Sequence, residues 1–307
     1  MSKIDFKLSV TGVKIIQFAT IFKNLKNITK QIKLVVTEEE LNSQGLDDAH
    51  CMLYTLNLKK AWFDEYESKN VTISVNCEFL GKIMNCVTPK TKKLIFQKTM
   101  KQDYLEISII NEGVETGKKS ILNADKDFKL PLIDMELDDL SIPEMDVDDA
   151  QMLMRSGDLS VLIQELSAFG EDIVIGVRDD EVILSTDSVE CGETTVSINT
   201  NLIEGFWKSE GDGEDGDGEE ELKFVFSLSR LNKILKFTPL SKSLTITIWK
   251  ENPMCIRFPL EKCIFSELTY GDDDELTEEE TETQMDEFME KKTNALAFYI
   301  APRMDID

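Results

Sequence analysis

The feature that most constrains the fold of this chain is an internal repeat with a period of about 150 residues. The stretch GKIMNCVTP at 81–89 matches NKILKFTP at 232–239 with one gap, and each is followed by a turn and a β-type run. The stretch VTGVKIIQFATIF in the first half corresponds in the same way to RSGDLSVLIQELSAF in the second. Such a repeat indicates duplication of one domain, so the 307 residues are expected to form two similar halves.

Short runs that alternate apolar and polar residues dominate both halves, and they predict β-strands. In the first half they lie at 32–38, 52–58, 71–76, 93–99 and 105–111. In the second half they lie at 172–178, 181–186, 194–199, 222–228, 244–249 and 254–260. Segments with helical periodicity lie at about 12–26, 77–87, 157–169 and 228–237. Two helices per half, in the same order among the strands, predict an α+β fold built by duplication.

The two halves are joined by a segment that is unusual for a passive linker. The sequence KLPLIDMELDDLSIPEMDVDDA at 129–150 carries two prolines and many acids, yet large apolar residues interrupt the charge. We expect an N-terminal domain at 1–129, a connecting loop at 130–149 and a C-terminal domain at 150–307. The second domain carries acidic insertions near 209–221 and 271–290, which are too charged to form a core.

The net charge of −25 is unevenly placed. Most of the excess acid lies in the connecting loop and the two insertions, which leaves the rest of the chain near neutral. Three of the four expected helices are basic, with lysines or arginine at Lys23, Lys82 and Lys233 among others. Lysine on one helix can simply be its solvent-facing side. Basic helices at repeated positions favour a shared electropositive surface, which suits sequence-independent contacts with phosphates.

Groups needed for most enzymatic chemistry are missing from the sequence. It has one histidine, His50, and neither a GxxxxGK[ST] loop nor a GxGxxG fingerprint. The six cysteines include no CxxC pair and are expected to be buried small residues rather than metal ligands or disulfides. We therefore expect no enzymatic activity, no metal and no cofactor. The absence of a long apolar run or an apolar N-terminus leads us to expect an intracellular protein without membrane association.

Four stretches together resemble the sliding-clamp family of proliferating cell nuclear antigen. They are LDDAHCMLYTLNL (46–58), LIDMELDDLSIPE (132–144), LSRLNKILKFTPLSKSLTITI (228–248) and the tail FYIAPRMDID (298–307). The resemblance covers nearly the whole chain but is divergent. It implies a duplicated clamp domain with two similar βαβββ-type repeats per domain, sheets outside, and four helices lining a ring interior.

The resemblance also implies function. Three identical subunits would close head to tail around duplex DNA, with joining edges near 119–130 of one subunit and 194–200 of the next. Such a ring is a processivity factor and a docking platform for DNA polymerase and other replication and repair proteins, and it is placed on DNA by a clamp loader. It would act in the nucleus of a cell, or at a viral replication site if the gene is viral.

Site residues carry over from the family by position. For DNA binding they are Lys14, Lys23, Lys82, Arg230, Lys233 and Lys236. Family arginines are replaced at Val161, Gln164 and Ser229, so the second domain is expected to be less basic. For partners with one aliphatic and two aromatic anchors, the pocket residues are Leu46, His50, Leu137, Leu140, Ile142, Pro143, Pro253, Tyr299, Ile300, Ala301 and Pro302.

Other interpretations stay open at this point. A checkpoint-type clamp subunit would need unlike partners, and a processivity factor can also be monomeric or dimeric. An acidic chaperone of basic proteins would use the acidic tracts instead. The apolar residues of the connecting loop could also serve only to pack that loop against the domains.

Overall fold

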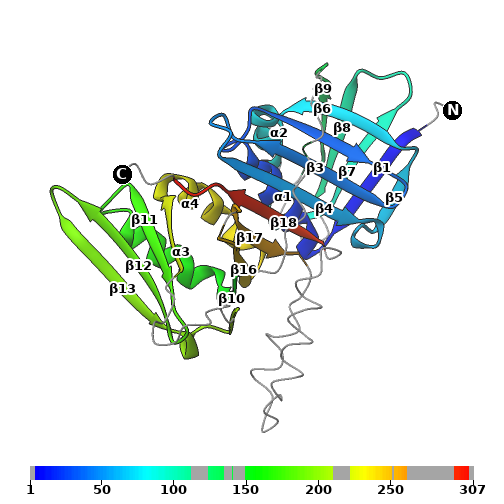
Figure 1. Ribbon diagram of the computed structural model, residues 1–307. Helices are drawn as coiled ribbons and strands as arrows, with labels where there is room; N and C mark the ends of the chain where they lie inside the picture. Colours follow the sequence, from blue (N-terminus) through cyan, green and yellow to red (C-terminus); the bar gives the residue numbers. More distant parts are fainter. Residues whose placement is uncertain are drawn as a thin grey trace, which may run out of the picture. The chain divides into compact units, whose positions relative to one another are not determined.

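The computed structural model describes residues 4–111, 124–134, 140, 149–209, 222–250, 252–260 and 294–303. The chain divides into two compact units, which are labelled by element in Figure 1. The first unit consists of Met1–Ala49 and Thr55–Ser141, and the second of His50–Tyr54 and Ile142–Asp307. The second unit therefore contains a short stretch from the first half of the sequence.

The first unit is built from two antiparallel sheets and two α-helices. The sheets have the strand orders β5-β1-β7-β8-β9 and β4-β3-β2-β6. In chain order the elements are β1 (Ile4–Thr11), α1 (Val13–Leu25), β2 (Gln31–Val36), β3 (Glu40–Leu46), β4 (Met52–Lys59), the 3-10 helix η1 (Lys60–Trp62), β5 (Glu65–Ser68), β6 (Val71–Asn76), α2 (Cys77–Met84), β7 (Thr91–Thr99), β8 (Tyr104–Asn111) and β9 (Lys126–Pro131).

The second unit repeats this plan. Its sheets have the orders β14-β10-β16-β17-β18 and β13-β12-β11-β15. In chain order the elements are β10 (Ala150–Arg155), α3 (Ser156–Leu166), β11 (Asp172–Val177), β12 (Glu181–Ser188), β13 (Gly192–Asn199), the 3-10 helix η3 (Thr200–Leu202), β14 (Gly205–Lys208), β15 (Leu222–Ser227), α4 (Leu228–Ile234), the 3-10 helix η4 (Leu235–Leu240), β16 (Ser243–Ile248), β17 (Met254–Pro259) and β18 (Ala295–Ile300).

The two units correspond element by element, so the predicted duplicated α+β fold is confirmed. β1 corresponds to β10, α1 to α3, α2 to α4, and the remaining strands follow in the same order. The second unit has one strand pairing that the first unit lacks. In it, β18 lies beside the beginning of β4. The Ala301 N–H extends this pairing by donating to the Cys51 carbonyl oxygen at 3.0 Å.

The core of the first unit is aromatic. Helix α1 buries Phe18 and Phe22 from one stripe at helical spacing, and Phe96 of β7 lies 5.0 Å from Phe18 between ring centroids. Gly81 lets α2 approach α1 closely, because a Cβ there would lie 3.4 Å from the Phe22 carbonyl oxygen and 3.2 Å from the Lys26 Cδ. The aromatic core and this close helix pair hold the exposed face of α1 in a fixed place.

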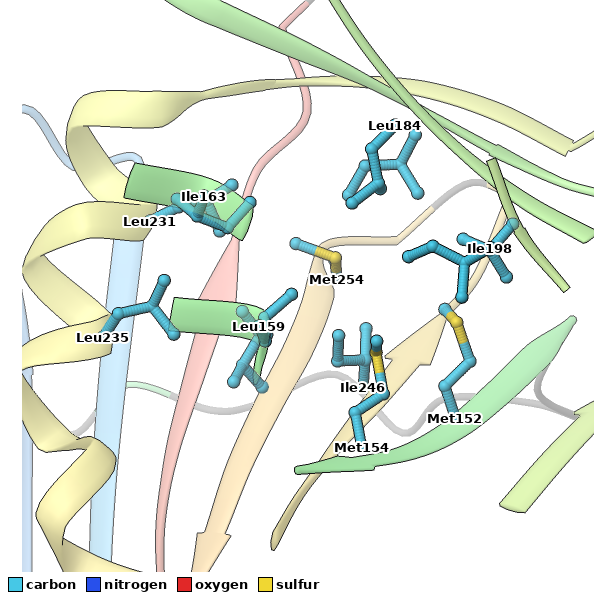
Figure 2. A pocket seen from close by; sticks show the side chains of 13 residues that line it. Met152, Met154, Leu159, Ile163, Leu184, Ile198, Leu231, Leu235, Ile246 and Met254 are labelled. Atoms are coloured by element: carbon cyan, nitrogen blue, oxygen red, sulfur yellow. The ribbon is translucent and has the colours of Figure 1, made fainter. Parts of the chain in front are cut away.

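The core of the second unit combines buried aromatic residues, among them Phe237, Phe258 and Phe298, with an aliphatic region that is less completely filled. Phe96 lies opposite Leu8 in the first unit, and Ile246 lies opposite Met152 at the corresponding position of the second. Ile246, Met152, Met154 and Met254 surround a small cavity of about 20 Å³ that is lined by apolar side chains alone (Figure 2). A cavity of this size is a packing defect, since it is too small for an organic ligand.

Gly170→Ala is expected to destabilise the second unit by about 1 to 3 kcal/mol. A Cβ at Gly170 would lie 2.0 Å from the Thr186 Oγ1 and 3.0 Å from the Asp187 carbonyl oxygen. Thr186 cannot turn away freely, because it is buried and its hydroxyl donates to the Asp172 carbonyl oxygen at 2.7 Å. Thermal unfolding measures the effect. Gly157→Ala in α3 is the matched control, since a Cβ there would meet no atom within 4 Å beyond its chain neighbours and the backbone of its own helix. An equal loss in both variants would refute the explanation.

Glu65 gives the first unit a pH-dependent contribution to stability. Its carboxylate forms ion pairs with Lys7 (2.7 Å) and Lys93 (2.6 Å), and these bonds lower the pKa of Glu65 to about 2. A lowered pKa stabilises the folded state above the ordinary carboxyl pKa, and the contribution is lost as pH falls toward 2. Glu65→Gln is therefore expected to lower the urea midpoint at pH 6 and to match the parent near pH 2. A constant difference at both pH values would contradict this.

Among the described cysteines, the expectation of burial holds for Cys77 and Cys255 only. Cys51 and Cys86 are half-buried, and Cys191 is exposed in the turn between β12 and β13, where no core is available to cover it. Cys263 lies outside the described residues. No helix in the described ranges is long and apolar enough to cross a lipid bilayer.

Candidate functional site

Helix α1 places its two candidate lysines on different faces. Lys23 is exposed, on the same face as the exposed apolar residues Val13 and Ile16. Lys14 is nine residues earlier, which turns it to the opposite side of the helix, and its Nζ lies over the Trp62 ring at 5.8 Å from the centroid. Lys23 therefore lies on the exposed face of α1, whereas Lys14 lies away from that face and beside Trp62.

Helix α2 begins at a side-chain cap and carries the third candidate lysine. The Asn76 side chain accepts from the Phe79 N–H at 3.0 Å, which fixes the start of the helix. Lys82 is exposed and forms an ion pair with Glu78 at 2.7 Å, and its Nζ lies 5.0 Å from the centroid of the exposed Phe79 ring. An exposed ion pair of this kind contributes little to the stability of the protein. Lys82 can therefore give it up for a contact with a phosphate.

In the second unit the basic residues follow one helix, α4, and the 3-10 turn after it. Arg230 and Lys233 are half-buried and Lys236 is exposed. The neighbouring helix α3 exposes Val161 and Gln164, where the family resemblance implies arginines. Asn232 joins the two helices by donating to the Ser167 Oγ at 2.6 Å, at the position that Gly81 occupies in the first unit. The structure thus brings positive charge to α4 but not to α3.

Strands β9 and β13 each end a sheet. Beside β9 lies a groove of about 580 Å³ formed with α2 and its N-terminal cap. The apolar residues in it include Phe79, Ile83, Phe128 and Leu130, and Lys82 and Lys129 stand at its sides. Phe79 is 53% exposed, so its aromatic ring lies open to solvent at this groove.

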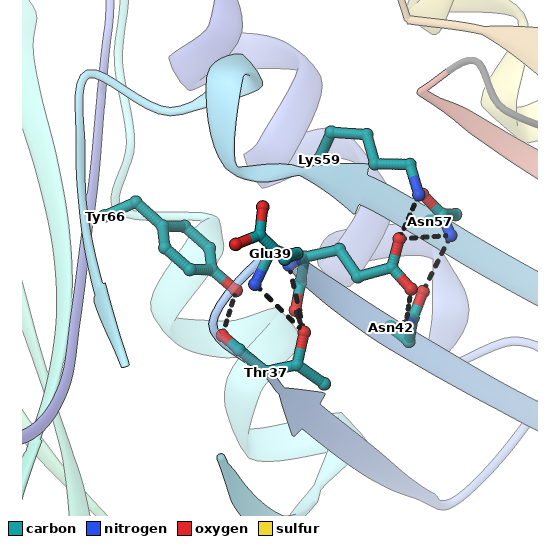
Figure 3. A network of polar contacts seen from close by, with 7 residues as sticks. Thr37, Glu39, Asn42, Asn57, Lys59 and Tyr66 are labelled. Carbon is teal, nitrogen blue, oxygen red and sulfur yellow. Dashed lines mark hydrogen bonds and ion pairs between the residues drawn. The ribbon is translucent and has the colours of Figure 1, made fainter. Parts of the chain in front are cut away.

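The outer face of β3 and β4 in the first unit carries a polar network (Figure 3). The Glu40 carboxylate accepts from Lys59, from Asn42 at 2.7 Å and from Asn57 at 3.2 Å. Burial alone would raise the pKa of Glu40, but these hydrogen bonds outweigh it and lower the pKa. The partner-site candidates Leu46 and Leu140, both half-buried, belong to the same unit.

The other described partner-site candidates gather at the end of β18 in the second unit. Tyr299 lies opposite Cys255 and packs against a buried cluster of Trp249, Cys255 and Ala297. Burial raises the pKa of Tyr299, so its phenol stays neutral. His50 precedes Cys51 in a turn with a left-handed backbone (φ 57°), which histidine adopts more readily than most residues. Pro253, Ala301 and Pro302 are half-buried or exposed, and Ile300 is buried.

Leu137, Ile142 and Pro143 lie outside the described residues, so their expected roles stay predictions. The structure also identifies side chains that the sequence did not single out. Arg303 anchors the tail, because its N–H donates to the Val225 carbonyl oxygen at 2.8 Å and its guanidinium pairs with Asp172. Gln44 contacts the backbone of Leu140. Neither contact has a local sequence signal, since each joins residues far apart in the chain.

Comparison with known proteins gives matches along most of the chain. A family model described as "Proliferating cell nuclear antigen, N-terminal domain" matches residues 13–139, and one described as "Proliferating cell nuclear antigen, C-terminal domain" matches residues 141–270. "Proliferating cell nuclear antigen 2" of Plasmodium falciparum (isolate 3D7) is 26% identical over 171 residues, which cover 55% of this chain and 63% of that relative. The match thus spans less than two thirds of the relative's length.

The fold is also similar to a solved structure. That structure is proliferating cellular nuclear antigen from Entamoeba histolytica, with a TM-score of 0.74 and 20% sequence identity, over 98% of this chain and 100% of that chain. The two family models meet near residue 140 and follow one another in the order of the two structural units. This chain belongs to the proliferating cell nuclear antigen family.

Proposed function

We propose that this chain is the subunit of a DNA sliding clamp, a noncatalytic ring that holds DNA polymerase and other replication and repair proteins on duplex DNA. The observation that carries the proposal is the match of both family domains to a chain whose two units repeat one plan. The ring acts where DNA is replicated, which is the nucleus in a cell or the replication site of a virus.

The duplicated plan itself supports closure into a ring. β18 lies beside the beginning of β4 within the second unit. By the correspondence between the units, β9 is the counterpart of β18 and β13 is the counterpart of β4. In the described part of the chain β9 and β13 each leave one edge unpaired, so β9 of one copy can pair with β13 of the next. Repetition of one such contact between unlike edges closes a ring of identical subunits, and the family resemblance favours three of them.

Charge and apolar surface at these edges favour the same contact. Lys126 and Lys129 lie on β9, whereas Glu193 lies on β13 and Glu190 lies in the turn before it. The groove beside β9 offers Phe79 and Phe128 for burial against the next copy. An apolar centre with complementary charges around it is typical of stable protein interfaces.

The mass of the protein in solution tests the assembly. Light scattering at micromolar concentration is expected to give about three times the chain mass of 35.0 kDa. A mass of one or two chains would exclude the homotrimer and favour a monomeric or dimeric processivity factor, or a checkpoint-type clamp subunit that needs unlike partners.

Removal of helix lysines is expected to weaken nonspecific DNA binding. Lys23→Ala combined with Lys236→Ala should lower affinity for duplex DNA about tenfold at low salt, and the salt dependence should fall by about one for each phosphate that is no longer bound. Fluorescence anisotropy across a salt series measures both quantities. Lys101→Ala, which removes an exposed lysine from the turn after β7, is the matched control. An equal effect in the control would show that overall charge, rather than these helices, governs binding.

A further inference from the structure

The connecting loop has one described residue between 135 and 148, Leu140, and a side chain of the first unit holds its backbone. The Gln44 amide nitrogen donates to the Leu140 carbonyl oxygen at 3.1 Å, and the Gln44 amide oxygen accepts from the Leu140 N–H at 2.8 Å. The two residues are 96 positions apart in the sequence and both are half-buried. One side chain thus satisfies both backbone groups of a single residue.

We propose that Gln44 is a positioning residue for partner binding, because its amide fixes the backbone of Leu140 so that the Leu140 side chain is presented to a partner. The inference rests on the proposed function for its partner, and it adds a residue outside the set that the family resemblance supplied. The partner chemistry is an extended peptide with apolar anchors.

The chemistry of the contact is specific to a side-chain amide. Among side chains, only those of Asn and Gln place a neutral N–H donor and a carbonyl acceptor in one plane, as a neighbouring β-strand would. Asn is one methylene shorter and would not span the same gap. Glu could still accept from the Leu140 N–H, but its negative charge would face the Leu140 carbonyl oxygen.

The neighbours of Gln44 explain why this residue alone serves the loop. Glu40, Asn42 and Gln44 lie on one face of β3, because they alternate with buried residues along the strand. Glu40 and Asn42 are occupied by Lys59 and Asn57 of β4, as Figure 3 shows. Gln44 lies past the end of that network, and its amide pairs with Leu140 instead.

The consequence for binding follows from conformational entropy. A connecting loop that is free in solution must be ordered when a partner binds, and this cost lowers affinity. For Leu140, whose backbone Gln44 already holds, this cost is reduced beforehand. The aliphatic side chain of Leu140 is then presented in one place rather than many.

The test compares Gln44→Leu with Asn42→Ala, which removes a neighbouring amide of the same face but not the bond to the loop. Two quantities are measured in the full chain. The first is hydrogen exchange of the Leu140 amide, followed by NMR on protein labelled with ¹⁵N-leucine. The second is the affinity for a synthetic peptide with one aliphatic and two aromatic anchors. Gln44→Leu is expected to speed exchange at Leu140 about tenfold and to weaken the peptide about tenfold, whereas Asn42→Ala should change neither.

Each of the other possible outcomes counts against a specific part of the proposal. Unchanged exchange at Leu140 in Gln44→Leu would overturn the contact itself, whatever the peptide does. Faster exchange with unchanged peptide affinity would overturn the positioning role. If the parent protein binds no such peptide, the positioning role is overturned along with the proposed partner site, while the exchange result still decides whether Gln44 holds the loop. Gln44→Glu should resemble Gln44→Leu, and parent-like peptide affinity in Gln44→Glu would also count against the proposal.

Discussion

Phe128→Asp is expected to convert the proposed ring into single chains. Phe128 is half-buried on the edge strand β9 and lines the groove that α2 completes with Phe79 and Ile83. If the next subunit fills this groove, the substitution replaces an aromatic anchor by a carboxylate. Assembly would then remove water from that charge, which is unfavourable. A truncated or charged anchor of this kind costs about 2 to 4 kcal/mol at each contact, roughly 30- to 700-fold in affinity.

Light scattering against concentration measures the change, and circular dichroism establishes that the subunit is still folded. Met100→Asp is the matched control, because Met100 is an exposed apolar residue of the first unit outside the groove. The control should keep the mass of the parent. Retention of that mass by Phe128→Asp would remove the groove from the interface and would leave the pairing of β9 with β13 without its apolar support.

Leu140→Asp and Tyr299→Ala are each expected to weaken the binding of partner peptides strongly while the proposed ring stays intact. Leu140 belongs to the connecting loop of the first unit, and Tyr299 belongs to the end of β18 in the second. Aromatic and aliphatic anchors bound to preformed apolar surfaces supply most of the affinity in such complexes. We expect a loss of at least about 2 kcal/mol, roughly 30-fold, for each variant.

Fluorescence anisotropy with the peptide measures affinity, and light scattering follows the ring in the same samples. Tyr299→Phe is the control for the tail, because it keeps the ring that packs against Trp249 and Ala297 and removes only the hydroxyl. It should bind nearly as well as the parent. Dissociation of the ring in Leu140→Asp would mean that the loop is a structural element, and the docking role of Leu140 would then fail.

The parts of the fold that could be predicted are those with strong periodicity. The four expected helices are present, because each has buried residues at helical spacing, as Leu159, Ile163 and Leu166 do in α3. Their ends were less well predicted. The second helix stops at Met84 rather than residue 87, because the chain tightens there and the Cys86 N–H donates to the Ile83 carbonyl oxygen three residues back.

The strands that sequence patterns did not indicate depend on contacts far along the chain. Strand β3 has the sequence ELNSQGL, which is rich in residues typical of turns. It is a strand because Leu41 and Ser43 are buried while Asn42 bonds to Asn57 of β4 at 2.9 Å. Strand β9 was missed because Asp127 and Pro131 are uncommon inside sheets, although they are tolerated at an edge.

The residues of the candidate site also divide into those that local sequence patterns indicate and those that depend on contacts far along the chain. Lysines could be assigned to helices from the sequence, but not to faces of helices, so Lys14 and Lys23 were grouped although α1 turns them apart. The contact of Gln44 with Leu140 could not have been found from either residue's neighbours. The pairing of β18 with β4, on which the ring argument depends, became visible only with the strand order.

The most direct test of the clamp is whether the protein is held on DNA by topology. A linear duplex is fixed to a bead at one end, the protein is allowed to thread onto the free end, and that end is then blocked with a bulky group. Retention through a high-salt wash, followed by release when a restriction enzyme cuts the duplex, is the result expected of a closed ring. Loss in the wash, or equal retention with the free end left open, would contradict it.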